Sequence, residues 1–109
     1  MHDDYAHVEP HRDEIDRLQG PALVEFGNPG CGWCRGAKPL VDSALADHPN
    51  VRHFKIADGR GRPLGRSFKV KLWPTLVFMR DGREVTRLIR PSRAVAIRDA
   101  LAQIDPRPH

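Results

Sequence analysis

The sequence predicts an α/β domain in which a mixed sheet of four or five strands lies between two layers of helices. Helix-like and strand-like segments alternate along the chain in the order helix, strand, helix, strand, helix, hairpin, helix. The most hydrophobic segment, Leu76–Met79, is expected at the centre of the sheet, because a continuous apolar run needs cover on both sides. The two cysteines of the chain, Cys31 and Cys34, fall where the first strand passes into a helix. Together these observations indicate a three-layer α/β/α sandwich.

The length of 109 residues is that of one domain. We expect residues 1–109 to form a single unit with a core over about 9–104, a frayed N-terminal arm and a frayed C-terminal tail. The sequence contains no apolar stretch of the roughly 18 residues that cross a bilayer. The first residues, Met1–Tyr5, are polar and lack the hydrophobic centre of a secretory signal. We therefore expect a cytoplasmic monomer that does not bind membranes.

The net charge of +4 and the isoelectric point of about 9.6 raise the question of an anionic partner. Basic residues, however, are spread along the chain and interleaved with acids. The densest basic segment is Arg60–Arg66, extended by Lys69 and Lys71. Two explanations stay open, a solvated basic loop and a surface that attracts an acidic partner.

The first elements follow from local patterns. Ala6–Val8 suits a short edge strand, and Pro10–Leu18 suits a helix that opens at the proline. Gly20 and Pro21 end this helix, and Ala22–Phe26 follows as an apolar strand. The Asn-Pro-Gly sequence at positions 28–30 predicts a turn directly before the cysteines.

The segment after the cysteines has helical periodicity as far as Asp47, where the His-Pro-Asn sequence at 48–50 ends it. Pro39 lies inside this helix and is expected to kink it by removing a backbone hydrogen bond. The apolar positions fall on one stripe, formed by Ala37, Leu40, Val41, Ala44 and Leu45.

The second half of the chain contains three further strands and two helices. Val51–Ala57 predicts a strand, and Pro63–Phe68 a short helix. The strand Trp73–Arg80 is followed by Asp81-Gly82, a favoured two-residue hairpin turn, and by the returning strand Glu84–Ile89. A last helix is expected with Ser92 as its N-cap, and its inward stripe consists of Ala94, Ile97, Leu101 and Ile104.

The Cys31-Gly32-Trp33-Cys34 motif indicates a redox-active pair, because two thiols at this spacing can join in a disulfide with little backbone movement. Cys31 would lie at a helix N-terminus, where free N–H groups and the macrodipole favour the thiolate. Arg35 and Lys38 add positive charge in the next turn. Cys34 lies further inside the helix and is expected to be the less exposed, resolving thiol. A purely structural disulfide is disfavoured, because closing so short a loop adds little stability.

Four further features occur with this motif: Glu25 six residues before Cys31, Pro39 in the following helix, the Trp73-Pro74-Thr75 sequence and the Asp81-Gly82 turn. In this combination, over roughly Glu9–Ile104, the chain resembles the thioredoxin family. The resemblance implies a buried acid at Glu25 and a cis-proline at Pro74 that lies against the cysteine pair.

The resemblance also implies the chemistry. Cys31 and Cys34 would exchange disulfides with protein substrates, and a thioredoxin reductase or another thiol donor would supply electrons. The redox-active disulfide Cys31–Cys34 would be the only redox group, with no metal or other cofactor. Glu25 would accept the proton of Cys34, directly or through water, although strand alternation also allows it to face solvent.

The substrate would contact Trp33, Trp73, Pro74 and Thr75. Family members carry Trp-Cys-Gly-Pro-Cys, whereas this chain has Gly30 before the first cysteine and Trp33 in place of the inner proline. Trp33 and Trp73 can form an aromatic lip around the thiols, or Trp73 can pack under its own loop; both alternatives stay open. Arg90 and Pro91 stand where the family has a glycine, so access from that side is in question.

Two other functions fit parts of the sequence. A thioredoxin-like binding or redox-sensing module would keep the motif without turnover. A zinc-dependent nucleic-acid-binding protein would use Cys31, Cys34, His48 and His53 as metal ligands. Pro49 and Asn50 separate the two histidines and break the helix that such a finger needs. We therefore expect neither a metal nor a nucleic-acid partner.

Overall fold

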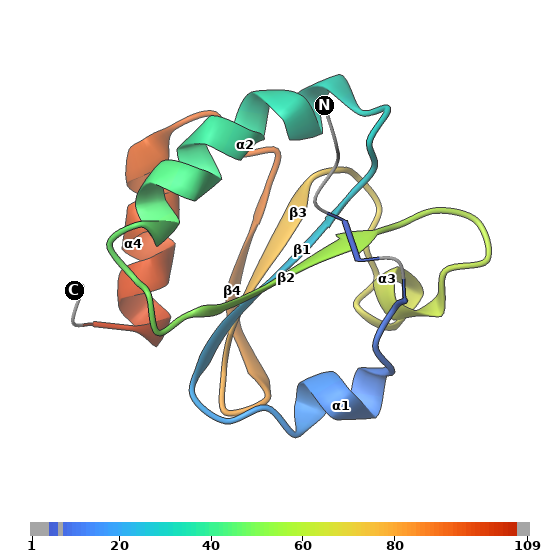
Figure 1. The fold of residues 1–109 in the computed structure, drawn as a ribbon, viewed down its shortest axis with the longest axis horizontal. Coiled ribbons are helices and arrows are strands. Elements are labelled where there is room, and N and C mark those ends of the chain that lie inside the picture. Colours follow the sequence, from blue (N-terminus) through green and yellow to red (C-terminus); the bar gives the residue numbers. More distant parts are fainter. Residues whose placement is uncertain (1–4, 7, 107–109) are drawn as a thin grey trace.

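The computed structural model describes residues 5, 6 and 8–106 (Figure 1). Helices and strands follow one another in the order that the sequence predicts. The elements are α1 (Arg12–Asp16), β1 (Pro21–Gly27), α2 (Gly32–Leu45), β2 (Arg52–Ala57), α3 (Pro63–Ser67), β3 (Thr75–Arg80), β4 (Arg83–Ile89) and α4 (Ala94–Ile104).

The four strands form one mixed sheet in the order β2-β1-β3-β4. β1 runs parallel to β2 and antiparallel to β3, and β3 and β4 form an antiparallel hairpin. β3 is an internal strand, as predicted, and Leu76, Val77 and Phe78 have no solvent exposure. Such a strand is covered on both faces, which explains its continuous apolar sequence.

Helices cover the two faces of the sheet and create two apolar clusters (Figure 1). Side chains alternate between the faces along each strand. Leu23 and Phe78 therefore pack with residues of α2 and α4, whereas Val24 and Val77 pack with residues of α1 and α3. The fold is the α/β/α sandwich that the sequence predicts. None of the described helices has the length and apolar character needed to span a bilayer.

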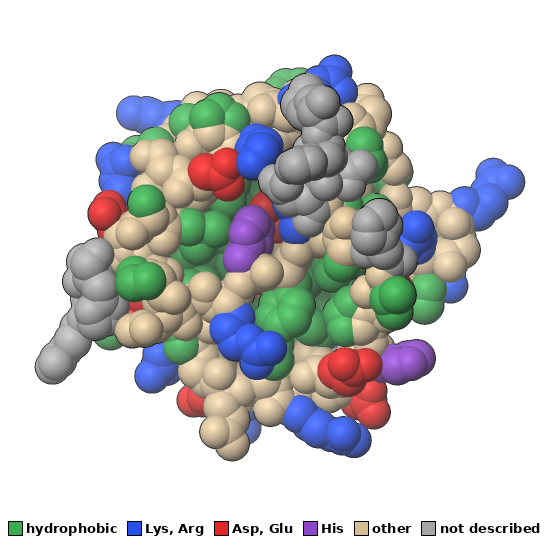
Figure 2. Space-filling model, in the orientation of Figure 1, with side chains coloured by type: hydrophobic (Ala, Val, Ile, Leu, Met, Phe, Trp, Pro, Cys, Tyr) green, Lys and Arg blue, Asp and Glu red, His purple; other side chains and the backbone are tan. Residues whose placement is uncertain are grey.

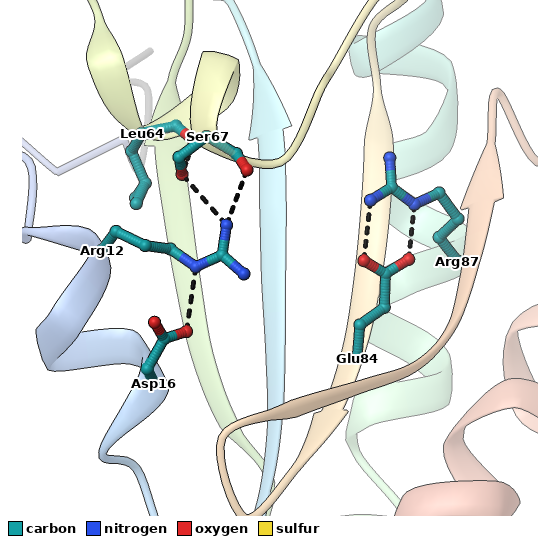
Figure 3. A network of polar contacts seen from close by, with 6 residues as sticks. All are labelled: Arg12, Asp16, Leu64, Ser67, Glu84 and Arg87. Atoms are coloured by element: carbon teal, nitrogen blue, oxygen red, sulfur yellow. Dashed lines mark hydrogen bonds and ion pairs between the residues drawn. The ribbon is translucent and has the colours of Figure 1, made fainter.

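Arg12 connects α1 to α3 beside the apolar cluster that contains Val24 and Val77 (Figure 3). Its Nε lies 2.9 Å from Asp16 Oδ1, and its Nη1 donates to the backbone oxygen of Ser67 at 2.7 Å. The guanidinium carbon also lies 3.7 Å from the ring centroid of Phe68. Nearby, Arg87 binds both carboxylate oxygens of Glu84 and donates to the carbonyl of Phe68 at 3.0 Å. These contacts hold the two short helices against the sheet.

Basic side chains do not gather into one patch on the face shown in Figure 2. Lys and Arg groups are scattered over this face, near its centre as well as around its rim, with acidic and apolar groups between them. Within the densest basic segment of the sequence, Arg60 and Arg66 are exposed and Arg62 is half-buried. This distribution agrees better with the solvated-loop explanation of the net charge.

Three local predictions differ from the structure. Ser92 does not cap α4, because the chain stays extended through Arg93, which is the N-cap and makes no side-chain capping bond. α1 is shorter than Pro10–Leu18, since the chain enters the helix only after His11, whose backbone N–H donates to Glu14. The expected strand Ala6–Val8 is a single parallel bridge from Ala6 to Ile56, and position 7 lies outside the described residues.

The β3–β4 turn needs its glycine for two separate reasons. Asp81 and Gly82 both have positive φ, at 53° and 78°, as the predicted hairpin turn requires. In addition, a Cβ on Gly82 would collide with the backbone carbonyl of Asp16 at the end of α1. Gly20 has the same φ of 78°, but a Cβ there would meet nothing within 4 Å.

Gly82→Ala is therefore expected to lower the free energy of unfolding by about 3 kcal/mol or more, from backbone strain plus the clash with Asp16. Gly20→Ala, the matched control with strain alone, should cost about 1 to 2 kcal/mol. Urea unfolding of both variants measures the difference. Equal losses would contradict the close approach of the turn to α1.

Candidate active site

The cysteine pair lies at the end of β1, where the chain turns into α2. Asn28 forms this turn: its carbonyl accepts from the backbone N–H of Cys31 at 3.0 Å, and its side chain accepts from Gly30 at 2.9 Å. Cys31 is the N-cap of α2, and its Sγ accepts the backbone N–H of Cys34 at 3.1 Å. Both thiols are free. Cys31 Sγ therefore caps the helix in the place of the Ser or Asp side-chain oxygen that commonly caps helix N-termini.

The two thiols differ in their surroundings. Cys34 is 4% exposed, whereas Cys31 is partly exposed. Burial, followed by the hydrogen bond to Cys31, raises the pKa of the Cys34 thiol to about 11. Cys34 is thus protonated at neutral pH in the reduced protein. The structure gives the asymmetry that the sequence predicts, with one accessible and one buried thiol.

The loop before β3 lies against this pair. The Trp73–Pro74 peptide bond is cis, and the carbonyl oxygen of Trp73 lies 3.8 Å from Cys31 Sγ, in contact with the thiol. Both features were predicted and are confirmed. Pro74 is buried, and Thr75 is 1% exposed with its hydroxyl donating to the carbonyl of Leu72 at 2.6 Å. The Thr75 side chain therefore holds the loop together from the inside.

Glu25 lies on the sheet face that α2 covers and is 1% exposed. Its burial is confirmed, and the alternative that it faces solvent is wrong. Oε1 lies 2.7 Å from Nε2 of His53, whose side chain is 26% exposed and reaches the surface. This partner was not predicted, although the alternation of β2 places His53 and Lys55 on the same face. A buried carboxylate that is hydrogen-bonded to an imidazole can exchange protons with solvent through it.

The two tryptophans are held by different partners. Trp33 is 58% exposed, and the guanidinium of Arg90 lies 4.9 Å from its ring. Trp73 is half-buried, and its indole N–H donates to Asp58 Oδ2 at 2.9 Å. Arg90 also donates from Nε to the carbonyl of Trp73 at 2.9 Å. Arg90, absent from the predicted site, is thus in contact with both tryptophans.

Arg90 adopts a φ of 51°, in the left-handed region that favours glycine. Its position was recognisable in the sequence only as a departure from the family glycine.

One more residue was missed altogether: the phenol of Tyr5 lies against Gly27 and hydrogen-bonds to Cys34. No local pattern in the N-terminal arm indicates this contact.

The ligands of the zinc-finger alternative do not come together. His48 Nδ1 lies 2.8 Å from Asp105 Oδ2, and His53 is bound to Glu25. Among residues 5, 6 and 8–106, no group of three or more His, Cys, Asp or Glu side chains is arranged to hold a metal ion. The described part of the chain therefore gives this alternative no support.

Comparison with known proteins agrees with this geometry. The thioredoxin family model matches residues 5–103. The chain belongs to the thioredoxin family. Over 70 residues it is 33% identical to a thioredoxin of Chlamydia pneumoniae, covering 64% of this chain and 69% of that protein. An H-type thioredoxin of Fagopyrum esculentum is 28% identical over 67 residues, covering 62% and 58%.

A solved structure of thioredoxin 2 from Pseudomonas aeruginosa in its reduced form is 53% identical to this chain. The TM-score is 0.84, and the match covers 95% of this chain and 96% of that one. A thioredoxin of Halobacterium salinarum, at 24% identity and a TM-score of 0.75, shares the fold. The sandwich is thus the fold of thioredoxins.

Reduced wild-type protein is expected to lose stability as the pH rises from about 9 to about 11. Unfolded Cys34 ionises near 9.0, whereas the folded thiol keeps its proton up to about 11. The folded state therefore binds this proton more tightly, and its contribution, at most about 2 kcal/mol, disappears over that window.

Urea unfolding at pH 8 and pH 11 under reducing conditions measures this loss, and Cys34→Ser is the control. The Tyr5 phenol, whose pKa is also raised by burial, contributes a loss of the same sign in both proteins. The wild type should therefore lose more stability than Cys34→Ser. Parallel pH profiles would contradict a buried, protonated Cys34.

Proposed function

We propose that this protein is a thiol–disulfide oxidoreductase that exchanges disulfides with protein substrates through Cys31 and Cys34. The observation that carries the proposal is the asymmetry of the pair. Cys31 is accessible and its sulfur accepts an N–H from the first turn of α2, whereas Cys34 is buried and protonated. An attacking thiol needs the first environment and a resolving thiol the second.

The reaction then has two steps. The Cys31 thiolate attacks one sulfur of a substrate disulfide, forming a mixed disulfide and releasing the other sulfur as a thiolate. Cys34 loses its proton and attacks Cys31 Sγ, so that the Cys31–Cys34 disulfide forms and the second substrate thiolate leaves. The substrate gains two electrons and the cysteine pair loses two. A thioredoxin reductase or another thiol donor would return the pair to the dithiol state.

Glu25 is the proton acceptor in this proposal. It is buried on the sheet face beneath α2, and it lies close enough to Tyr5 to act electrostatically on the phenol that contacts Cys34. Because His53 is bound to Glu25 and partly exposed, it offers a route by which the proton can leave to solvent. Glu25 and His53 together would therefore link the buried thiol to water.

The substrate would lie over Trp33 and along the loop that precedes β3. An extended peptide can pair with the backbone before Pro74, and the exposed indole of Trp33 offers an apolar contact. Trp73 would shape this loop through its bond to Asp58, and Thr75 through its bond to Leu72. These contacts would favour substrates that carry apolar side chains next to their disulfide.

The remaining assignments follow from the family. Its members use the cysteine pair as their redox group, so we propose no metal or other cofactor for this chain. We also propose a cytoplasmic location, a monomeric state and no binding to nucleic acid or membrane. A protein disulfide is the proposed substrate class.

One observation favours a binding or redox-sensing module without turnover as the second candidate. The Trp73 carbonyl, a backbone group at the expected substrate edge, already accepts a hydrogen bond from Arg90. A substrate that pairs there would first have to displace this side chain. Reduction of insulin in the presence of dithiothreitol separates the two functions, because only an oxidoreductase accelerates it.

The two cysteine variants should behave differently. Cys34→Ser should form a stable mixed disulfide with a disulfide-containing substrate through Cys31, because no thiol remains to resolve it. Cys31→Ser should trap no complex and should lose insulin reduction completely. Non-reducing electrophoresis after mixing with oxidised substrate measures the adduct. Equal behaviour of the two variants, with no adduct from either, would rule out this division of roles.

Glu25→Gln should slow the resolution of the mixed disulfide by at least about tenfold at neutral pH, because the amide cannot accept the Cys34 proton. Single-turnover kinetics followed by tryptophan fluorescence measure this step. Glu84→Gln is a matched control, since that carboxylate is bound to Arg87 on β4. An unchanged rate in Glu25→Gln would remove Glu25 from the mechanism.

A further inference from the structure

Tyr5 places a hydroxyl group beside the buried thiol of the cysteine pair. The residue is 9% exposed, and its phenol hydrogen-bonds to Cys34. A Cβ added to Gly27 would lie 2.5 Å from Tyr5 Oη and 2.9 Å from Cys34 Sγ. The hydroxyl and the thiol thus meet at the point where any other residue at position 27 would carry its side chain. Gly27 makes room for this contact.

The backbone holds Tyr5 at this position. The N–H of Ala6 donates to the carbonyl of Lys55 at 2.8 Å, and Ala6 forms a parallel bridge with Ile56 of β2. Lys55 Nζ also lies 4.8 Å from the centroid of the Tyr5 ring. The described part of the N-terminal arm is therefore attached to the free edge of β2 (Figure 1). From there the phenol reaches Gly27 of β1 and Cys34 of α2.

The surroundings of the phenol make it a hydrogen-bond donor and not a base. Burial, followed by the charge and hydrogen bonding of Cys34, raises its pKa well above the ordinary value, so that the hydroxyl keeps its proton. Other charged groups face it as well: Lys55 over the ring, Glu25 from β1 and Cys31 from α2. Tyr5 also lines a surface pocket of about 480 Å³, together with Asp58, Arg60 and Arg62. A separate pocket of about 510 Å³ lies along the β2 edge of the sheet and is not lined by Tyr5.

We propose that Tyr5 is a catalytic residue of the second step, whose hydroxyl donates a hydrogen bond to Cys34 Sγ and stabilises the thiolate that attacks Cys31. The proposal rests on the proposed function. In this step the Cys34 proton passes to the base, the Cys34 sulfur bonds to Cys31 Sγ, and the Cys31–substrate bond breaks. The substrate sulfur leaves with the electron pair. The Tyr5 hydroxyl keeps its proton throughout this step, and none of its own bonds breaks.

The chemistry explains why a donor is useful here. Burial makes the Cys34 thiolate costly, as the raised pKa of this thiol shows. A hydrogen bond to a charged group is stronger than one to a neutral group. The Tyr5 hydroxyl therefore favours the thiolate over the thiol and lowers the barrier to resolution. Cys31 has its own donor, the backbone N–H of Cys34, and does not depend on Tyr5.

The first test does not require turnover. In a Cys31→Ser background, Cys34 is the only cysteine, and the ¹³Cβ chemical shift follows its titration by NMR. Tyr5→Phe keeps the ring and removes the hydroxyl, and it should raise the apparent pKa of Cys34 by about one unit. An identical titration in the two proteins would overturn the proposal.

The second test follows the reaction. Tyr5→Phe should slow resolution of the mixed disulfide about tenfold. The attack of Cys31, measured by adduct formation in a Cys34→Ser background, should stay within about twofold because its donor is intact. If the wild-type protein fails to resolve the adduct, the proposed oxidoreductase function is refuted, and the Cys34 titration still tests the hydrogen bond from Tyr5. If the wild type turns over normally and Tyr5→Phe resolves the adduct at the wild-type rate, only the proposed role of Tyr5 is refuted.

A double-mutant cycle with Gly27 provides an independent check. Gly27→Ala should displace the phenol hydroxyl from Cys34, and because its Cβ would also lie 2.9 Å from Cys34 Sγ, it should slow resolution at least as much as Tyr5→Phe. Because both changes remove one contact, their combined effect should be clearly smaller than the product of the separate fold-changes. Gly36→Ala, at a helical position where a Cβ meets nothing within 4 Å, is the matched control and should resolve at the wild-type rate. Fully multiplicative effects would contradict the contact.

Discussion

The N-terminal cap of α2 is the interaction on which the site depends. Helix α2 starts after the short turn at residues 28–31 that follows β1, and its first free N–H groups need an acceptor. Cys31 Sγ supplies it by accepting the N–H of Cys34. One hydrogen bond therefore begins the helix, holds the accessible sulfur at its N-terminus and orients the second cysteine. Asn28 prepares this arrangement by closing the turn between β1 and α2.

The sheet supplies the second requirement, which is burial beneath the cap. β1 is an internal strand, so that Glu25 and Gly27 lie under α2 and away from solvent. Cys34 points into the same region, and burial keeps it protonated. In the proposed reaction such a thiol needs a proton acceptor and a donor to its thiolate. Glu25, which is hydrogen-bonded to His53, is the proposed acceptor, and the hydroxyl of Tyr5 is the proposed donor. The apolar clusters of the sandwich also create the low-dielectric environment that keeps Cys34 protonated, whereas Cys31 stays accessible to solvent.

Local sequence patterns were sufficient for the order of the elements and for the parts of the site that lie next to each other in the chain. The apolar run of β3 identified an internal strand, and the Cys31–Cys34 spacing identified the helix start. Family resemblance added the cis bond at Pro74 and the burial of Glu25. The N-cap of α4 was misplaced by one residue, because Ser92 has the right side chain but Arg93 has the extended backbone that precedes the helix. Propensity alone does not separate two such neighbours.

The contacts that were missed join residues far apart in the sequence. Glu25 and His53 are 28 positions apart, Trp73 and Arg90 are 17 apart, and Asp58 and Trp73 are 15 apart. Their partners depend on strand register and loop course, which periodicity does not give. Tyr5 is the extreme case, since its contact depends on a missing side chain at Gly27 and on a single bridge to β2.

The reduction potential of the Cys31–Cys34 pair tests the central claim most directly. Equilibration in thiol–disulfide buffers, followed by tryptophan fluorescence, gives this quantity. A reversible two-electron transition between about −270 and −120 mV is predicted, in the range of catalytic pairs. A pair that shows no reversible transition, or one below about −300 mV as structural disulfides do, would contradict the account.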